Sequence, residues 1–219
     1  LTDYTLALAK GATLDEITFH NIAKKLHEYT GLDQPLIEKG NLRISGPVFE
    51  KNLLGDSSEI TGRLDSRFKG ESYNPLSGYP EYDPMDSYIS PAFTSAFNSY
   101  VRDQLHFGDN LQYKTSGNVE PWDFKRRGYV GFPNVMNDLA QAMIYDPGMK
   151  VMLNMGYFDL GTPYFEGVYE MQHLPMPNSL QKNIEFHKYL SGHMGYLHQE
   201  SLKKLHDNVK DFILKTTGK

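Results

Sequence analysis

The sequence predicts an α/β fold, in which a mostly helical, loop-rich first part precedes a second part where helices alternate with strands. Two observations carry this prediction. From residue 134 onward the hydrophobic pattern alternates between helical spacing and short apolar runs, giving the order helix, strand, helix, strand, helix. Before that point, helical patterns are separated by polar segments rich in Pro and Gly. We therefore expect two regions, residues 1–130 and residues 131–219.

Helical patterns dominate the first region. Its clearest helix follows Thr13 and Glu16, which have the spacing of a capping box, and Gly31 provides the stop. The hydrophobic spacing predicts a second long helix from about Phe93 to Leu105. The shorter expected elements are a helix at 1–10, helices near 35–38 and 47–54, and a half-exposed strand at 60–68.

The second region contains the two predicted strands. Met149–Met155 is a nearly unbroken apolar run, which suits a strand buried on both faces. Thr162 and Pro163 have the pattern of an N-cap and a first helical residue, so we expect a helix from there to about Leu174. Ile184–Leu190 is the second strand, and the flanking helices are expected at about 135–143 and 202–213.

Composition excludes several classes of function. The chain has 219 residues and a net charge of −5, with no basic run that would form a binding face for nucleic acid or anionic lipid. No apolar stretch is long enough to span a bilayer. The absence of cysteine excludes disulfides, thiolate metal sites and a cysteine nucleophile. We expect no cofactor, no metal, no nucleic-acid partner and no membrane partner.

Asp159 and His193 are the candidate catalytic residues, because each directly follows a predicted strand. In parallel sheets, functional groups gather at the carboxyl ends of strands. An acid followed by a histidine matches the last two members of the order Ser, Asp, His in α/β-hydrolases. The imidazole would accept a proton from a serine hydroxyl, and the carboxylate would orient the ring. An Asp and a His at strand ends also occur in purely structural roles.

Two segments resemble a known family. Met152–Pro163 (MLNMGYFDLGTP) and Ser191–His198 (SGHMGYLH) are similar to the Asp and His segments of the serine carboxypeptidase-like family. The likeness extends over the whole chain. The absence of cysteine differs from the disulfide-rich eukaryotic members of the family and therefore favours the bacterial type. It implies the C-terminal part of an α/β-hydrolase sheet, preceded by a helical insertion that lids the active site. It further implies that Met194 lines the substrate site; the alternative is that Met194 packs beneath its loop.

The resemblance also implies what the intact protein would do. Members of the family release C-terminal residues from peptides through a serine acyl-enzyme. We expect this chain to act with a missing N-terminal half or with a second copy of itself, and to be inactive alone. The expected location is secreted or periplasmic. Two alternatives remain: an esterase or acyltransferase on the same scaffold, and a non-catalytic binding domain.

Ser72 imitates the nucleophile motif of this family. Gly70-Glu-Ser-Tyr73 matches its first four residues, but Asn74 and Pro75 depart from it. The preceding segment is too charged for the buried strand of a nucleophile elbow, and Pro and Gly residues prevent a following helix. We therefore expect the nucleophilic serine to lie upstream of this chain.

Overall fold

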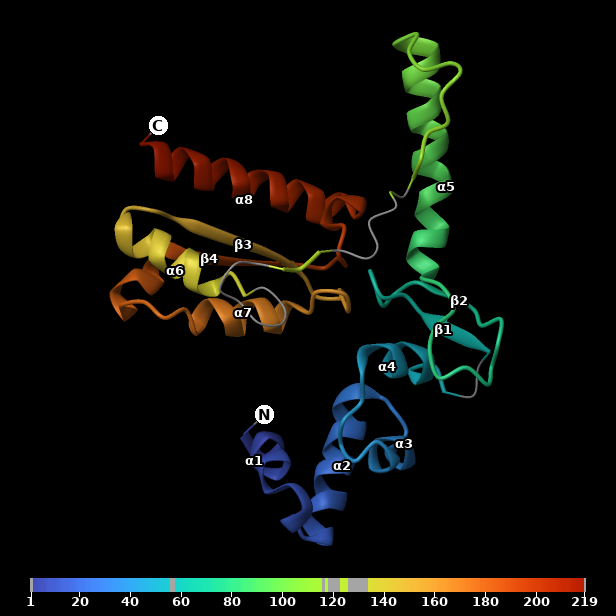
Figure 1. Cartoon of the computed structure of the whole chain (residues 1–219), viewed down its shortest axis with the longest axis vertical. Coiled ribbons are helices and arrows are strands. Elements are labelled where there is room, and N and C mark those ends of the chain that lie inside the picture. Colours follow the sequence, from blue (N-terminus) through green and yellow to red (C-terminus); the bar gives the residue numbers. More distant parts are fainter. Residues whose placement is uncertain (1, 56–57, 116, 118–122, 126–133, 219) are drawn as a thin grey trace. The chain divides into compact units, whose positions relative to one another are not determined.

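The computed structural model describes residues 2–55, 58–115, 117, 123–125 and 134–218, and these form two compact units (Figure 1). Unit 1 is Leu1–Asp86 and unit 2 is Ser87–Lys219. The boundary expected at residues 130/131 lies outside the described residues.

The described residues of unit 1 form four α-helices, a short 3-10 turn and a small hairpin. The helices are α1 (Thr2–Lys10), α2 (Glu16–Thr30), α3 (Gln34–Lys39) and α4 (Gly46–Asn52). The side chains buried between the first three helices and the turns that follow α2 and α3 are Ala7, Ile22, Ala23, Leu32, Ile37 and Leu42. The expected capping box at the start of α2 is wrong. Asp15 is the N-cap and accepts the Thr18 N–H at 2.8 Å, whereas the Thr13 hydroxyl donates to the Lys10 carbonyl.

The strand expected at residues 60–68 is wrong as a single element. Only its first residues are strand, in β1 (Glu59–Thr61). A turn follows, and β2 (Lys69–Glu71), beyond the expected range, pairs antiparallel with β1. Asp65 is buried in the turn and accepts the backbone N–H and the guanidinium of Arg67. Alternation of hydrophobic residues could not distinguish this turn from a strand, because a side-chain ion pair stabilises it.

The long helix α5 (Pro84–Ser99) begins nine residues earlier than expected (93 − 84) and continues into a π-helical turn, Tyr100–Gln104. Asp83 accepts the N–H of Met85 at 2.8 Å, and Pro84 is tolerated because the first helical turn needs no N–H donor there. The hydrophobic spacing identified the later part of the helix, and the polar start was missed.

The second part of unit 2 confirms the expected order of elements. These are α6 (Met136–Tyr145), β3 (Val151–Gly156), α7 (Tyr164–Gln172), β4 (Ile184–Tyr189) and α8 (Gln199–Thr217). The two strands are parallel and in register from Val151↔Ile184 to Gly156↔Tyr189. The fold is therefore α/β in this coarse sense, and among the described residues this sheet has two strands.

Helices cover both faces of this sheet (Figure 1). On one face, Val151 of β3 and Ile184 and Phe186 of β4 pack in a core with α6 and the end of α7. On the other face, Asn208 of α8 donates to the Tyr189 hydroxyl at 3.1 Å, and that hydroxyl donates to Asn154 Oδ1 at 2.8 Å. Side chains alternate between faces along a strand, so Met152, Asn154 and Gly156 belong to the α8 face.

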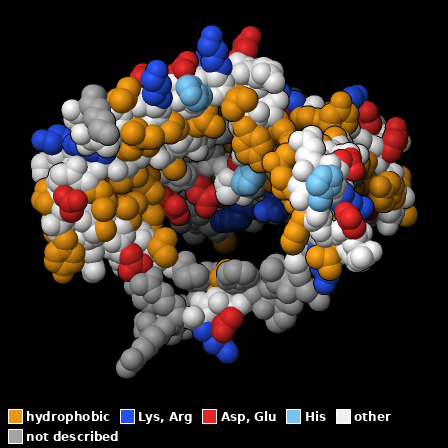
Figure 2. Space-filling model, turned by 90° about the horizontal axis from the view of Figure 1, so that it is seen from above, with side chains coloured by type: hydrophobic (Ala, Val, Ile, Leu, Met, Phe, Trp, Pro, Cys, Tyr) orange, Lys and Arg blue, Asp and Glu red, His pale blue; other side chains and the backbone are white. Residues whose placement is uncertain are grey.

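The sheet and its helices leave many apolar side chains exposed. In α8 only Ser201 is fully buried, while Leu202 and Ile213 are exposed. In the view of Figure 2, hydrophobic side chains lie at the surface of the molecule. Across the residues that the structure describes, no helix combines the length and the apolar character needed to cross a membrane.

Candidate active site

The ends of β3 and β4 bring Asp159 and His193 together. Because the strands are parallel, the loops that follow them leave the same edge of the sheet. The two loops are also hydrogen-bonded to one another. The Tyr157 N–H donates to the Tyr189 carbonyl at 3.0 Å, and the Phe158 N–H donates to the Ser191 carbonyl at 3.1 Å.

The two side chains meet directly. His193 Nδ1 lies 2.9 Å from Asp159 Oδ2. The carboxyl group is 5% exposed and the imidazole 44% exposed, so a buried acid holds a base that solvent or substrate can reach. An ionised carboxylate can only accept hydrogen bonds, which places a proton on Nδ1, so that in the neutral ring the lone pair is on Nε2.

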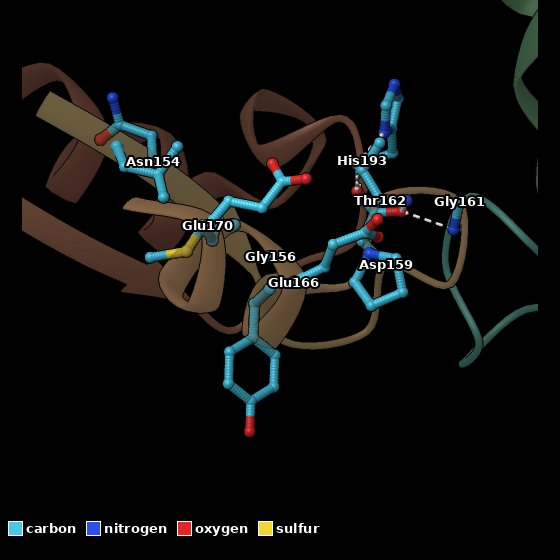
Figure 3. Close-up of a pocket in the computed structure, with 13 residues that line it drawn as sticks. Asn154, Gly156, Asp159, Gly161, Thr162, Glu166, Glu170 and His193 are labelled. Carbon is cyan, nitrogen blue, oxygen red and sulfur yellow. Dashed lines mark hydrogen bonds and ion pairs between the residues drawn. The ribbon is translucent and has the colours of Figure 1, made fainter. Parts of the chain in front are cut away.

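Thr162 and Gly161 fix the carboxylate. The N–H groups of both residues donate to Asp159 Oδ1, at 2.8 Å from Gly161 and 2.9 Å from Thr162. The Thr162 hydroxyl donates to Oδ2 at 2.6 Å and lies 3.2 Å from His193 Nδ1 (Figure 3). The prediction that Thr162 caps α7 is wrong: Pro163 is the N-cap residue and α7 begins at Tyr164. Sequence reasoning missed that the Thr162 side chain instead binds the acid.

These contacts set the charge of Asp159. Burial favours the neutral acid, but the hydrogen bonds from Thr162 and from His193 outweigh it, so the pKa of Asp159 lies below its ordinary value. The carboxylate is therefore ionised at neutral pH, as a group that orients a histidine and stabilises its protonated form must be.

Gly156 lets the two loops approach each other. A Cβ at this position would lie 2.2 Å from the Gly192 carbonyl oxygen and 2.5 Å from that of Ser191. Both atoms belong to the backbone that carries His193, and neither can move without moving the histidine. The sequence signal was present, as a small residue at the end of the strand, but its cause is visible only in the structure.

A cavity of about 480 Å³ adjoins the Asp159–His193 pair. Residues of β3 and α7 line it, and Figure 3 shows Asn154 at the end away from His193. Glu166 also lines it, and none of the described lining residues is Lys or Arg. The cavity is therefore acidic, with the imidazole at one end.

Met194 does not line this cavity. It lines a second one, of about 310 Å³, together with Tyr196 and side chains of α5. Ser191, three residues before Met194, is 2% exposed, and its hydroxyl has no hydrogen-bond partner among the described residues.

Ser72 lies in unit 1, just after β2, in a partly buried polar cluster. Lys51, whose side chain is 7% exposed, donates to the Ser72 hydroxyl, to the Asn74 carbonyl at 3.0 Å and to Glu81 at 2.7 Å. The hydrogen bond from Lys51 lowers the pKa of Glu81. An ammonium that donates three hydrogen bonds has no lone pair with which to activate a serine. The chain turns after Ser72 rather than forming the helix of a nucleophile elbow.

Among the described residues, no group of three His, Cys, Asp or Glu side chains is placed to hold a metal ion. Comparisons with protein-family models, with curated proteins and with solved structures find no match to this chain.

Proposed function

We propose that this chain supplies the acid and the base of a Ser-His-Asp triad in a serine carboxypeptidase-like hydrolase. The observation that carries the proposal is the 2.9 Å contact between His193 Nδ1 and Asp159 Oδ2. All hydrogen bonds of His193 to described residues use Nδ1, which leaves Nε2 available to a nucleophile. The nucleophilic serine comes from an upstream part of the same protein, and the chain alone is inactive.

The proposed reaction uses each group in turn. The serine hydroxyl attacks the peptide carbonyl while His193 Nε2 takes its proton, and Asp159 stabilises the resulting imidazolium. His193 then gives that proton to the leaving amine, which departs as the C-terminal residue. A water molecule, deprotonated by His193, hydrolyses the acyl-enzyme and regenerates the serine.

The resemblance of residues 152–163 and 191–198 to this family supports the choice of a peptide as substrate. The same groups would hydrolyse an ester, so the substrate must be tested. The full-length gene product is incubated with a peptide that has a free C-terminal carboxylate, with its C-terminal amide, and with the corresponding ester. Release of the last residue from the free acid alone, lost by about 10⁶-fold in His193→Ala, supports a carboxypeptidase. Turnover of the ester only would make the protein an esterase. No turnover of any substrate would favour a binding domain.

A further inference from the structure

Glu50 is an acidic side chain that the fold buries without a partner. It lies on α4, which packs against β1 (Figure 1), and the residue is 4% exposed. Its Oε1 would lie 3.8 Å from a Cβ built at Gly46, so this oxygen lies close to the first turn of its own helix. Among the described residues, none donates a hydrogen bond to the Glu50 carboxyl and none forms an ion pair with it.

Two other acidic side chains of unit 1 show how such a group is normally held. Asp65, which is 2% exposed, forms an ion pair with Arg67 at 2.7 Å. Glu81 forms one with Lys51, also at 2.7 Å. Lys51 directly follows Glu50 in the chain, and its ammonium is already engaged in that cluster. Buried charges are paired in native proteins, so burial without a partner favours the neutral form of Glu50.

Two charged groups act on Glu50 from the segments beside α4, namely Arg63 and Asp83. Burial raises the pKa of Glu50 above its ordinary value, the exposed Arg63 opposes this shift, and the negative charge of Asp83 adds to it. Asp83 is fixed in place, because its carboxylate accepts the N–H groups of Leu64 and Met85, both at 2.8 Å. It therefore cannot turn away when Glu50 loses its proton.

We propose that Glu50 is a proton-dependent latch, which holds α4 against the β1–β2 hairpin while its carboxyl is neutral and releases α4 when it ionises. A carboxylate at this place is buried beside a second one, and no hydrogen bond from a described residue offsets the lost hydration. Displacement of α4 returns the charge to water. The inference concerns unit 1 alone and holds whether or not the proposed function is correct.

The direction of the pH dependence follows from the raised pKa. The stabilisation of the α4 contact is complete below the unfolded pKa of about 4.3 and is lost as the pH rises through the higher folded value. Acid therefore tightens the contact between α4 and the hairpin, and neutral pH loosens it. This is the opposite of Asp159, whose pKa is lowered by folding.

The test is amide hydrogen exchange of the full-length gene product, read at Phe49 and Leu53. Their N–H groups donate to the carbonyls of Ser45 and Phe49, both at 2.9 Å, so they exchange when α4 opens. Protection is corrected for the intrinsic exchange rate at each pH and compared with that of Glu50→Gln, which keeps the shape of the side chain and cannot ionise. Glu28→Gln is the matched control, because Glu28 is exposed on α2.

We expect wild type and Glu50→Gln to be equally protected at pH 4, within about 2-fold. At pH 7.5 the α4 amides of Glu50→Gln should be protected at least about 3-fold more than those of the wild type. Glu28→Gln should match the wild type at both pH values. Equal protection of Glu50→Gln and the wild type at pH 7.5, or weaker protection in the variant, would overturn the inference.

Arg63→Gln gives a second measurement with a stated sign. Arg63 is exposed, and its charge favours the ionised form of Glu50. Without it, the loss of α4 protection should move to higher pH when measured at low ionic strength. The double variant Arg63→Gln/Glu50→Gln should show no such loss. A transition that stays in place or moves to lower pH in Arg63→Gln, or one that persists in the double variant, would show that Glu50 is not the group that releases α4.

Discussion

The α-carbon of Gly156 faces the carbonyl of Gly192 so closely that a Cβ at position 156 would lie 2.2 Å from that oxygen. The end of β3 and the loop that carries His193 are therefore in backbone contact. The distance between Asp159 and His193 depends on this contact, because Asp159 follows Gly156 by three positions and His193 directly follows Gly192.

Gly156→Ala should separate the two loops. We expect the rate of labelling of the full-length product by a fluorophosphonate to fall at least 100-fold, since a displacement of about 1 Å at a catalytic group has effects of that size. Gly78→Ala is the control, because a Cβ at Gly78 meets no atom within 4 Å. Equal rates for the two variants would show that the loop contact does not position the histidine.

Thr162 should act as a positioning residue through its hydroxyl. Thr162→Val removes the donor that lies 2.6 Å from Asp159 Oδ2 and keeps the size of the side chain. A hydrogen bond to a charged group contributes about 1.5–3 kcal/mol, so we expect kcat/KM to fall by roughly 10- to 100-fold. Thr162→Ser restores the hydroxyl and should recover most of the rate. A serine variant as slow as the valine variant would refute this role.

The stability of the fold should depend on the charge of Asp159. Folding lowers its pKa, so the ionised form stabilises the folded state. This contribution is fully present above the unfolded pKa of about 3.9 and is lost as the pH falls through the lower folded value. We expect the difference in unfolding free energy between the wild type and Asp159→Asn to be largest near pH 7 and to shrink below about pH 4. If the difference in unfolding free energy between the two proteins did not change with pH, the lowered pKa of Asp159 in the folded state would be contradicted.

The Lys51 cluster should stabilise unit 1 and have no part in catalysis. Lys51→Met leaves Glu81 and Ser72 without the ammonium to which both are hydrogen-bonded, which should lower the unfolding free energy measurably. Lys25→Met is the matched control: its ion pair with Asp3 is exposed to solvent, so the loss of unfolding free energy should be clearly smaller than for Lys51→Met. Ser72→Ala should leave fluorophosphonate labelling unchanged, and loss of label would make Ser72 the nucleophile.

The elements of the second region could be predicted because their signals are local. Apolar runs, helical spacing and the positions of Asp159 and His193 after two strands are all visible in the sequence. The role of Thr162 could not be predicted, because Thr before Pro has the pattern of a helix cap. Only the position of the Asp159 carboxylate in the folded loop shows that the Thr162 hydroxyl donates to it instead. The turn at Asp65 was missed for the same reason, since a side-chain ion pair with Arg67 decides it. Strand neighbours depend on pairing between distant segments, which a local pattern does not encode.

The most direct test of the account is to locate the serine that reacts with a fluorophosphonate. The full-length gene product, its His193→Ala variant and residues 1–219 alone are treated in parallel, and the label is mapped by mass spectrometry. We expect one labelled serine upstream of Leu1, a loss of labelling of about 10³-fold or more in His193→Ala, and no label in residues 1–219 alone. A label on Ser72, or a label that persists without His193, would contradict it.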